Sequence, residues 1–158
     1  MAESLESPQS AENSRSAEGA HTLHVDIVSP EGAIFSGPAR TVFLPASQGE
    51  IGIFPRHAPL LTLLKPGEVR VQSPDGVEHP FYVGGGALEV QPHRVTVLAD
   101  TALRAKDIDE AAALAAKQHA EETLRTKVDK IGQAEALAEL AQAMARLKVL
   151  QRLRKLHG

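Results

Sequence analysis

The chain has 158 residues, with 42% apolar and 3% aromatic side chains, no cysteine and a formal net charge of −3. This length fits one ordinary domain or a small domain with an appendage, and the lack of cysteine excludes disulfides, thiolate metal sites and thiol catalysis. Because the acidic first twenty residues account for the net charge, the balanced remainder argues against a nucleic-acid binder.

The first segment, residues 1–20, is rich in Ser, Glu and Ala and has almost nothing to bury, so it is predicted to be a disordered tail. It lacks the basic start and apolar middle of a secretion signal. No apolar run in the chain approaches the length that spans a bilayer, so membrane association is expected only through a partner.

A period of two runs from Thr22 to Ala99, beginning where Leu23, Val25 and Ile27 alternate with His24 and Asp26, and predicts a β domain over residues 21–104. Clusters of Gly and Pro separate the alternating runs. Several short strands at this spacing predict a β-sandwich or flattened barrel of about eight to ten strands.

A proline and a run of glycines constrain the backbone at two places in this region. Pro80 cannot donate a ladder hydrogen bond, so its strand is expected at an edge or with a bulge. The run Gly84-Gly85-Gly86 has no helix N-terminus after it, so it predicts a bulge or a close backbone crossing rather than a phosphate-binding loop.

After Asp100 the pattern becomes helical, and residues 105–158 are predicted to form an antiparallel two-helix hairpin. Asp107 is expected to cap the first helix, which runs to about Val128, with Glu110 in capping-box position. Gly132 is expected to break the pattern before a second helix, from about residue 134 to residue 156.

The second helix carries larger apolar side chains that are expected to form its buried stripe: Leu137, Leu140, Met144, Leu147, Leu150 and Leu153. The first helix is rich in alanine, and at about 25 cal/mol per Å² an alanine seam stabilises much less than a leucine seam. Such a hairpin could open without melting, as a mobile regulatory arm requires. The alternative is a hairpin docked permanently on the sandwich.

The sequence contains no phosphate-binding loop with its lysine, no nucleophile elbow and no paired-cysteine zinc site. Its seven histidines form neither an i, i+4 helix pair nor a close pair on one strand face. We therefore predict no catalytic residues, no metal site and no enzyme activity of its own.

Two groups of charged residues are candidates for recognition. Glu50 lies between glycines and His57 follows Arg56 before a rigid Ala-Pro, so turns can display both side chains. The second helix ends in a run of cations: Arg146, Lys148, Arg152, Arg154 and Lys155. Some of this charge complements the helix dipole, but five cations exceed that need and indicate an acidic partner.

The segments 49–61 and 84–100 resemble the epsilon subunit of the bacterial F-type rotary ATP synthase, and the likeness extends over residues 22–156. The resemblance implies a non-catalytic rotor subunit that couples the c-ring to the gamma subunit during proton-driven ATP synthesis. It also implies a peripheral position on the cytoplasmic face of the bacterial inner membrane, held through the complex.

The resemblance assigns roles to individual residues. It implies contact with the c-ring for Glu50, Arg56 and His57. Contact with gamma is implied for the opposite face of the sandwich, at Gly84, Gly85, Gly86 and Leu88. The cations of the second helix would meet an acidic segment of the beta subunit in the alpha–beta head and inhibit ATP hydrolysis.

Some relatives bind ATP at the start of the first helix through a motif of Ile or Leu, Asp, two variable residues, Arg and Ala. The matching run begins at Ile108 and Asp109, but Ala112 occupies the arginine position. Losing a charge-assisted contact costs about 1.5–3 kcal/mol, so no useful ATP binding is predicted and no cofactor is expected.

A rival interpretation is a free-standing β-sandwich that binds a ligand and dimerises through its helices. Affinity capture distinguishes the two interpretations. A rotor subunit would bring down gamma and the alpha and beta subunits, whereas a free-standing module would elute alone or as a dimer.

Overall fold

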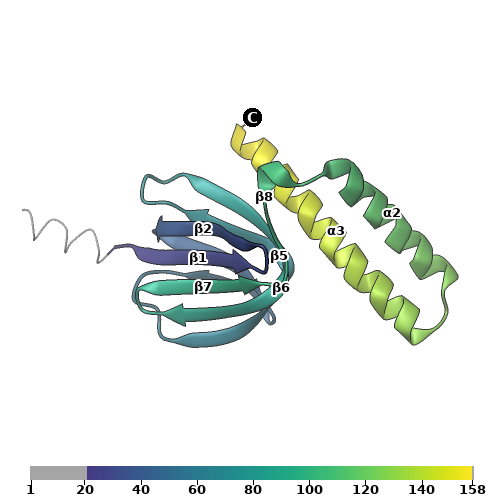
Figure 1. The fold of residues 1–158 in the computed structure, drawn as a ribbon, viewed down its shortest axis with the longest axis horizontal. Coiled ribbons are helices and arrows are strands. Elements are labelled where there is room, and N and C mark those ends of the chain that lie inside the picture. The colour runs from purple at the N-terminus through teal and green to yellow at the C-terminus, as the bar shows by residue number, and fades with distance from the viewer. Residues whose placement is uncertain (1–20, 158) are drawn as a thin grey trace, which may run out of the picture.

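The computed structural model describes residues 21–157, which form an eight-stranded β-sandwich followed by a two-helix hairpin (Figure 1). The strands are β1 (Leu23–Ser29), β2 (Gly32–Ala39), β3 (Thr41–Ala46), β4 (Gly49–Ile53), β5 (Leu60–Gln72), β6 (Glu78–Gln91), β7 (Arg94–Ala99) and β8 (Ala102–Arg104). A short 3-10 turn, η1 (Ala105–Asp107), leads to helices α2 (Glu110–Thr126) and α3 (Lys130–His157). The predicted fold class is confirmed. The predicted tail, residues 1–20, lies outside the described residues.

The strands follow the order β2-β1-β7-β6-β5-β3-β4, with β8 paired to β6. Neighbours are antiparallel except β1 and β7, which are parallel. The curved sheet encloses a core of aliphatic side chains, in which Val25 and Ile27 are fully buried. His24 and Asp26 lie on the outer face of β1, as the period of two predicted.

The glycine run bends β6 where this strand changes neighbours. On one side of the bend β6 pairs with β8, and on the other side it pairs with β7. The β5–β6 ladder skips the pair of Lys65 and Gly85 without changing register. Gly85 and Gly86 have φ angles of 107° and 137°, and a Cβ atom on Gly86 would lie 2.1 Å from the carbonyl oxygen of Leu98. The predicted close backbone crossing is therefore confirmed.

Pro80 was expected on an edge strand. Its strand is not at an edge, but Pro80 itself is paired on one side only. β6 is a central strand of the sheet. However, the ladder with β8 starts at Phe81, so only β5 pairs with Pro80. The missing N–H group therefore costs no ladder hydrogen bond at this point.

The predicted cap of the first helix is wrong by two residues. Asp107 lies in η1, and the N-cap of α2 is Asp109, whose carboxylate accepts a hydrogen bond from the N–H of Ala112 at 3.1 Å. Asp109 adopts the extended backbone of an N-cap, so its side chain can reach the first free N–H groups of the helix.

Gly132 does not break the helices, which corrects a second expectation. It lies inside α3, and the chain reverses over residues 127–129 instead. The carboxylate of Asp129 accepts a hydrogen bond from the N–H of Gly132 at 2.9 Å and so caps the start of α3.

The predicted alanine seam joins the two helices, and of the predicted leucine stripe Leu150 is buried, in the core shared with Tyr82 of the sandwich. The alanines buried in the hairpin are Ala113 and Ala120 of α2 and Ala136 and Ala143 of α3. Leu137 and Met144 of the predicted stripe are 56% and 52% exposed. Because α2 offers α3 a face of small side chains, the two helices approach closest when α3 turns its own alanines inward.

Candidate functional surfaces

The second half of α3 packs against β5 and β6 and forms a small second core with them. Tyr82, the only tyrosine in the chain, is 3% exposed there, beside Val149 and Leu150. Burial raises the pKa of Tyr82, against the opposing effects of the Arg146 guanidinium and of a hydrogen bond with Thr101. The hairpin is therefore docked on the sandwich through aliphatic side chains, each of which contributes about 1.5–3 kcal/mol when fully buried.

A buried ion pair lies beside this second core. Glu68 on β5 is 6% exposed, and both of its carboxylate oxygens accept hydrogen bonds from Nε of Arg152 on α3, at 2.9 and 3.1 Å. Nε of Arg70 lies 3.4 Å from the same carboxylate. Glu68 is thus shared between one arginine of the sandwich and one arginine of the hairpin.

Arg70 extends this contact to the edge of the sandwich. Its Nη2 atom donates a hydrogen bond to Glu50 at 2.6 Å, and its Nη1 atom lies 3.7 Å from Glu78. The guanidinium carbon stands 4.6 Å from the ring centre of Phe43. Together with Glu68, three carboxylates therefore surround one guanidinium, which the aromatic face holds in place.

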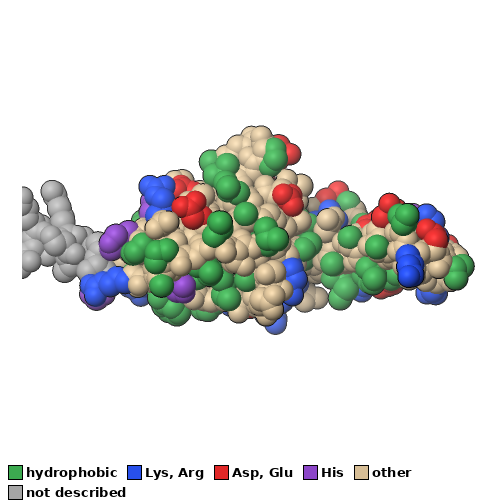
Figure 2. Space-filling model, turned by 90° about the horizontal axis from the view of Figure 1, so that it is seen from below, with side chains coloured by type: hydrophobic (Ala, Val, Ile, Leu, Met, Phe, Trp, Pro, Cys, Tyr) green, Lys and Arg blue, Asp and Glu red, His purple; other side chains and the backbone are tan. Residues whose placement is uncertain are grey.

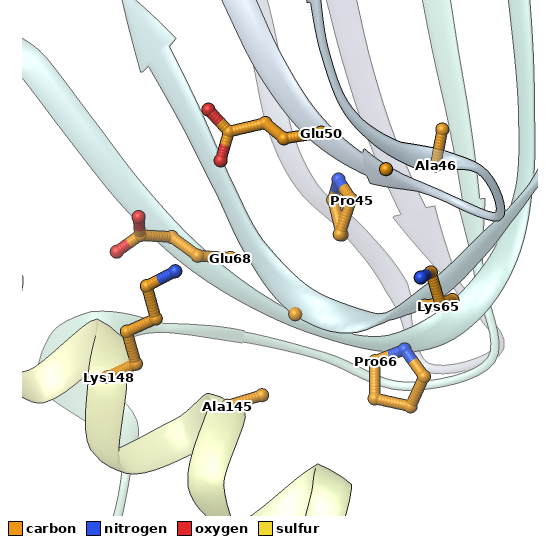
Figure 3. Close-up of a pocket in the computed structure, with 10 residues that line it drawn as sticks. Pro45, Ala46, Glu50, Lys65, Pro66, Glu68, Ala145 and Lys148 are labelled. Atoms are coloured by element: carbon orange, nitrogen blue, oxygen red, sulfur yellow. The ribbon is translucent and has the colours of Figure 1, made fainter.

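Figure 3 shows the hollow between this edge and the hairpin. It has a volume of about 290 Å³ and is lined by the β3–β4 edge, by residues 65–68 of β5 and by α3. The carboxylates of Glu50 and Glu68 lie on one side of it, and Lys148 extends from α3 toward Glu68. The hollow therefore joins the predicted ring-contact acid to a predicted inhibitory cation.

The structure does not bring the three predicted ring-contact residues together. Glu50 lies near the start of β4, at the end of the strand next to α3. Arg56 and His57 follow the opposite end of this strand. There the N–H of Arg56 donates a hydrogen bond to the carbonyl of Pro92 at 2.8 Å, and Arg56 lines a hollow with Arg40. Figure 2 shows histidine side chains (purple) and basic side chains (blue) at the end of the sandwich that lies away from the helices. Glu50 and the Arg56–His57 pair therefore belong to two separate surfaces.

An exposed apolar surface borders the glycine run. Leu63, Ala87 and Leu98 are neighbours across β5, β6 and β7, and Leu61, Leu63 and Leu98 are 76%, 67% and 54% exposed. Leu88 is fully buried in the sandwich core, so its side chain is not part of this exposed surface. The period of two explains the difference, because Leu88 points to the face opposite that of Ala87.

Comparisons with known proteins decide the family. Residues 22–105 match the family described as ATP synthase, Delta/Epsilon chain, beta-sandwich domain, and residues 106–151 match its long alpha-helix domain. The chain is similar to the ATP synthase epsilon chain of Nitrosococcus oceani, with 65% identity over 139 residues, which covers 88% of this chain and 99% of the relative.

The chain belongs to the ATP synthase epsilon-chain family. The family predicted from the sequence is therefore confirmed. Two solved structures share its fold: a chain of the Euglena gracilis mitochondrial ATP synthase (TM-score 0.74, 17% identity, 82% of each chain), and a chain of the Tetrahymena thermophila central stalk and c-ring (TM-score 0.57, 13% identity, 81% of this chain and 96% of that one).

Three of the five cations at the end of this epsilon-family chain have partners in the docked hairpin. Arg152 binds Glu68, Arg154 pairs with Glu110 of α2, and Arg146 stands 5.6 Å from the ring centre of Tyr82. Lys155 is exposed and Lys148 borders the hollow. Docking on the sandwich therefore occupies Arg146 and Arg152, and pairing within the hairpin occupies Arg154, all three of which the family resemblance assigns to the beta subunit.

The run that matches the ATP motif is already used within the chain. Ile108 is buried in the second core, Asp109 caps α2, and Glu110 pairs with Arg154. Ala112, at the motif's arginine position, is exposed. A methyl group therefore stands at the motif's arginine position, and the carboxylates of Asp109 and Glu110 are engaged within the chain.

The sequence pattern had predicted none of the docking residues Glu68, Arg70 and Tyr82. Glu68 stands at an outward position of an alternating strand, which predicts exposure, and only the tertiary contact with α3 buries it. A signal for Tyr82 was present, because the unbroken apolar run from Phe81 to Val83 is typical of a strand covered on both faces.

Among residues 21–157, no group of three or more His, Cys, Asp or Glu side chains is placed to hold a metal ion. In the same part of the chain, no helix has the length and apolar character needed to cross a membrane. The candidate surfaces of this epsilon-family chain are the Glu50 edge of β3 and β4, the Arg56–His57 loop, the leucine surface formed by Leu61, Leu63 and Leu98, and the helical hairpin.

Proposed function

We propose that this chain is a non-catalytic rotor subunit of a proton-translocating F-type ATP synthase. Its sandwich would couple the c-ring to the gamma subunit, and its hairpin would inhibit ATP hydrolysis by reaching the alpha and beta subunits. The observation that carries the proposal is the match to an ATP synthase epsilon chain over 99% of that relative's length. The subunit would lie on the cytoplasmic face of the bacterial inner membrane, attached through the complex alone.

The proposed gamma contact is the leucine surface formed by Leu61, Leu63 and Leu98, together with the backbone of the adjoining glycine run. Exposed leucines on neighbouring strands form an apolar surface that a second protein can cover. The bend of β6 at Gly84–86 adds a shallow hollow beside them, into which a partner side chain can fit.

The proposed ring contact is the Glu50 edge, with the Arg56–His57 loop at the other end of β4 as a separate surface. Glu50 is half-exposed and held by Arg70, so its carboxylate is oriented in advance for a polar partner. A carboxylate held in this way loses less side-chain entropy when it binds than a freely rotating one.

Charge reversal tests this ring contact. Glu50→Lys is expected to reduce co-purification of the c-ring with the assembled head at least about tenfold, since losing a charge-assisted contact costs about 1.5–3 kcal/mol. The matched control is Glu122→Lys on the exposed side of α2. The ring contact is disproved if c-ring recovery is the same with both variants.

Calorimetry tests the predicted lack of nucleotide binding. The purified chain titrated with Mg·ATP is expected to give no saturable heat. Ala112 stands where the motif has its arginine, and Glu110 adds negative charge nearby. Ala112→Arg provides the comparison, since it restores the motif. Saturable binding at millimolar or lower ATP by the unaltered chain would overturn the prediction.

Affinity capture from cells tests the proposal as a whole. A rotor subunit brings down gamma together with the alpha and beta subunits, and a variant with Leu61→Asp and Leu63→Asp should lose gamma first. The free-standing, ligand-binding dimer is the competing result: it would elute alone or as a pair of chains, and this outcome would reject the rotor assignment.

A further inference from the structure

The contacts between the Glu50 edge and the hairpin form one continuous series of charges. Glu50 accepts a 2.6 Å hydrogen bond from Arg70, Arg70 lies 3.4 Å from Glu68, and Glu68 accepts two hydrogen bonds from Arg152. The series begins on β4, crosses β5 and ends on α3. The proposed ring contact and the docked hairpin therefore share one arginine.

We propose that Arg70 couples Glu50 to hairpin docking, so that a partner that neutralises the Glu50 carboxylate loosens the hairpin from the sandwich. Only the identity of that partner as the c-ring rests on the proposed function. The coupling itself is a property of the free chain.

The sign of the coupling follows from the distances. With Glu50 in place, the closest carboxylate contact of Arg70 is the 2.6 Å bond to Glu50, and Glu68 is left to Arg152. If Glu50 is neutralised, Glu68 becomes the nearest carboxylate to Arg70, at 3.4 Å against 3.7 Å for Glu78. Two guanidinium groups then compete for one carboxylate, and each interacts with it less favourably.

A second electrostatic effect acts in the same direction. Lys148 and Arg152 of α3 both face the side of the sandwich that carries Glu50 and Glu68. Neutralising Glu50 lowers the negative charge that attracts these cations. The effect is strong for a partly buried group and weaker in high salt, where the screening length falls to about 3 Å at 1 M.

The chain offers a direct way to measure docking, because it contains no cysteine. A single cysteine at Val149 is covered only while α3 is docked, since Val149 is fully buried in the second core. A single cysteine at Val97 is covered by the sandwich itself, where Val97 is fully buried in the first core. The rate of thiol labelling at each position then reports undocking and sandwich opening separately.

The test compares Glu50→Gln with Glu89→Gln, an exposed acid on the part of β6 that lies beyond the glycine bend. Glu50→Gln is expected to speed labelling at V149C at least about fivefold, a typical lower value for coupling between two sites, and to leave labelling at V97C unchanged. Glu89→Gln is expected to change neither rate. Arg152→Gln should speed labelling at V149C by more than about tenfold, because it leaves Glu68 buried without its main partner.

Three results would overturn the inference. Equal labelling rates at V149C for Glu50→Gln and Glu89→Gln would exclude the coupling. An unchanged labelling rate at V149C in Arg152→Gln would show that the Arg152–Glu68 ion pair does not stabilise docking. A parallel rise at V97C would assign the effect to general loosening of the sandwich. Because the assay uses the free chain, failure of the rotor assignment would show in affinity capture and leave these rates unaffected.

Discussion

Gly86→Ala is expected to destabilise the sandwich by at least about 3 kcal/mol. Two causes combine. A φ of 137° strains any residue with a side chain, and the added Cβ atom would lie 2.1 Å from the backbone oxygen of Leu98. That oxygen cannot retreat, because Leu98 lies on β7, which pairs with β1 on one side and with β6 on the other.

Gly32→Ala is the matched control for this experiment. Gly32 has nearly the same φ, 132°, but a Cβ atom placed there would meet nothing within 4 Å. Gly32→Ala is expected to lower the free energy of unfolding by about 1–2 kcal/mol, through backbone strain alone. Urea unfolding of both variants, followed by circular dichroism, measures the difference. Equal losses would mean that backbone strain, and not crowding against β7, makes glycine necessary at position 86.

Deleting residues 133–158 is expected to raise ATP hydrolysis by the assembled enzyme about two- to tenfold, which corresponds to a barrier lowered by up to about 1.4 kcal/mol. The deletion removes α3 from Gln133 onward, and with it all five cations proposed to meet the beta subunit. Steady-state hydrolysis by enzyme reconstituted with full-length or shortened chain measures the effect. An unchanged rate would reject the inhibitory role.

A milder variant separates loss of the arm from loss of its charge. Lys148→Gln with Lys155→Gln removes two cations and leaves the ion pairs of Arg152 and Arg154 in place. The hairpin should therefore keep its apolar core and its main ion pair and lose only the attraction between Lys148 and the acids across the hollow, while its charge toward an acidic partner falls. Hydrolysis should rise to a value between those of the full-length and shortened chains. If it stays at the full-length rate, the arm does not act through these two lysines.

The docked hairpin is held at one end. Val149 and Leu150 lie in the second half of α3, and Arg152 follows one turn later. The first half of α3 and the whole of α2 project beyond the sandwich (Figure 1). Undocking would therefore expose few large apolar side chains, while the alanine seam between the helices could remain closed. This arrangement favours movement of the hairpin as one unit.

The sequence alone determined the fold class and the family. Alternation at Leu23, Val25 and Ile27 can be satisfied only by a strand with one buried face, and the alanine-rich segment has a strong helix propensity in any surroundings. Such properties are local, so they can be read from short stretches of the chain. The glycine run was likewise readable, because only glycine tolerates the φ angles found at Gly85 and Gly86.

Only the tertiary structure decided which faces meet. Glu68 stands where a strand residue would normally be solvated, and it is buried because α3, more than sixty residues later, crosses above it. For the same reason Leu137 and Met144 lie outside while smaller alanines lie inside. Burial and charge pairing between distant segments depend on how closely the segments pack, and the periodicity of one segment holds no information about the shape of its partner.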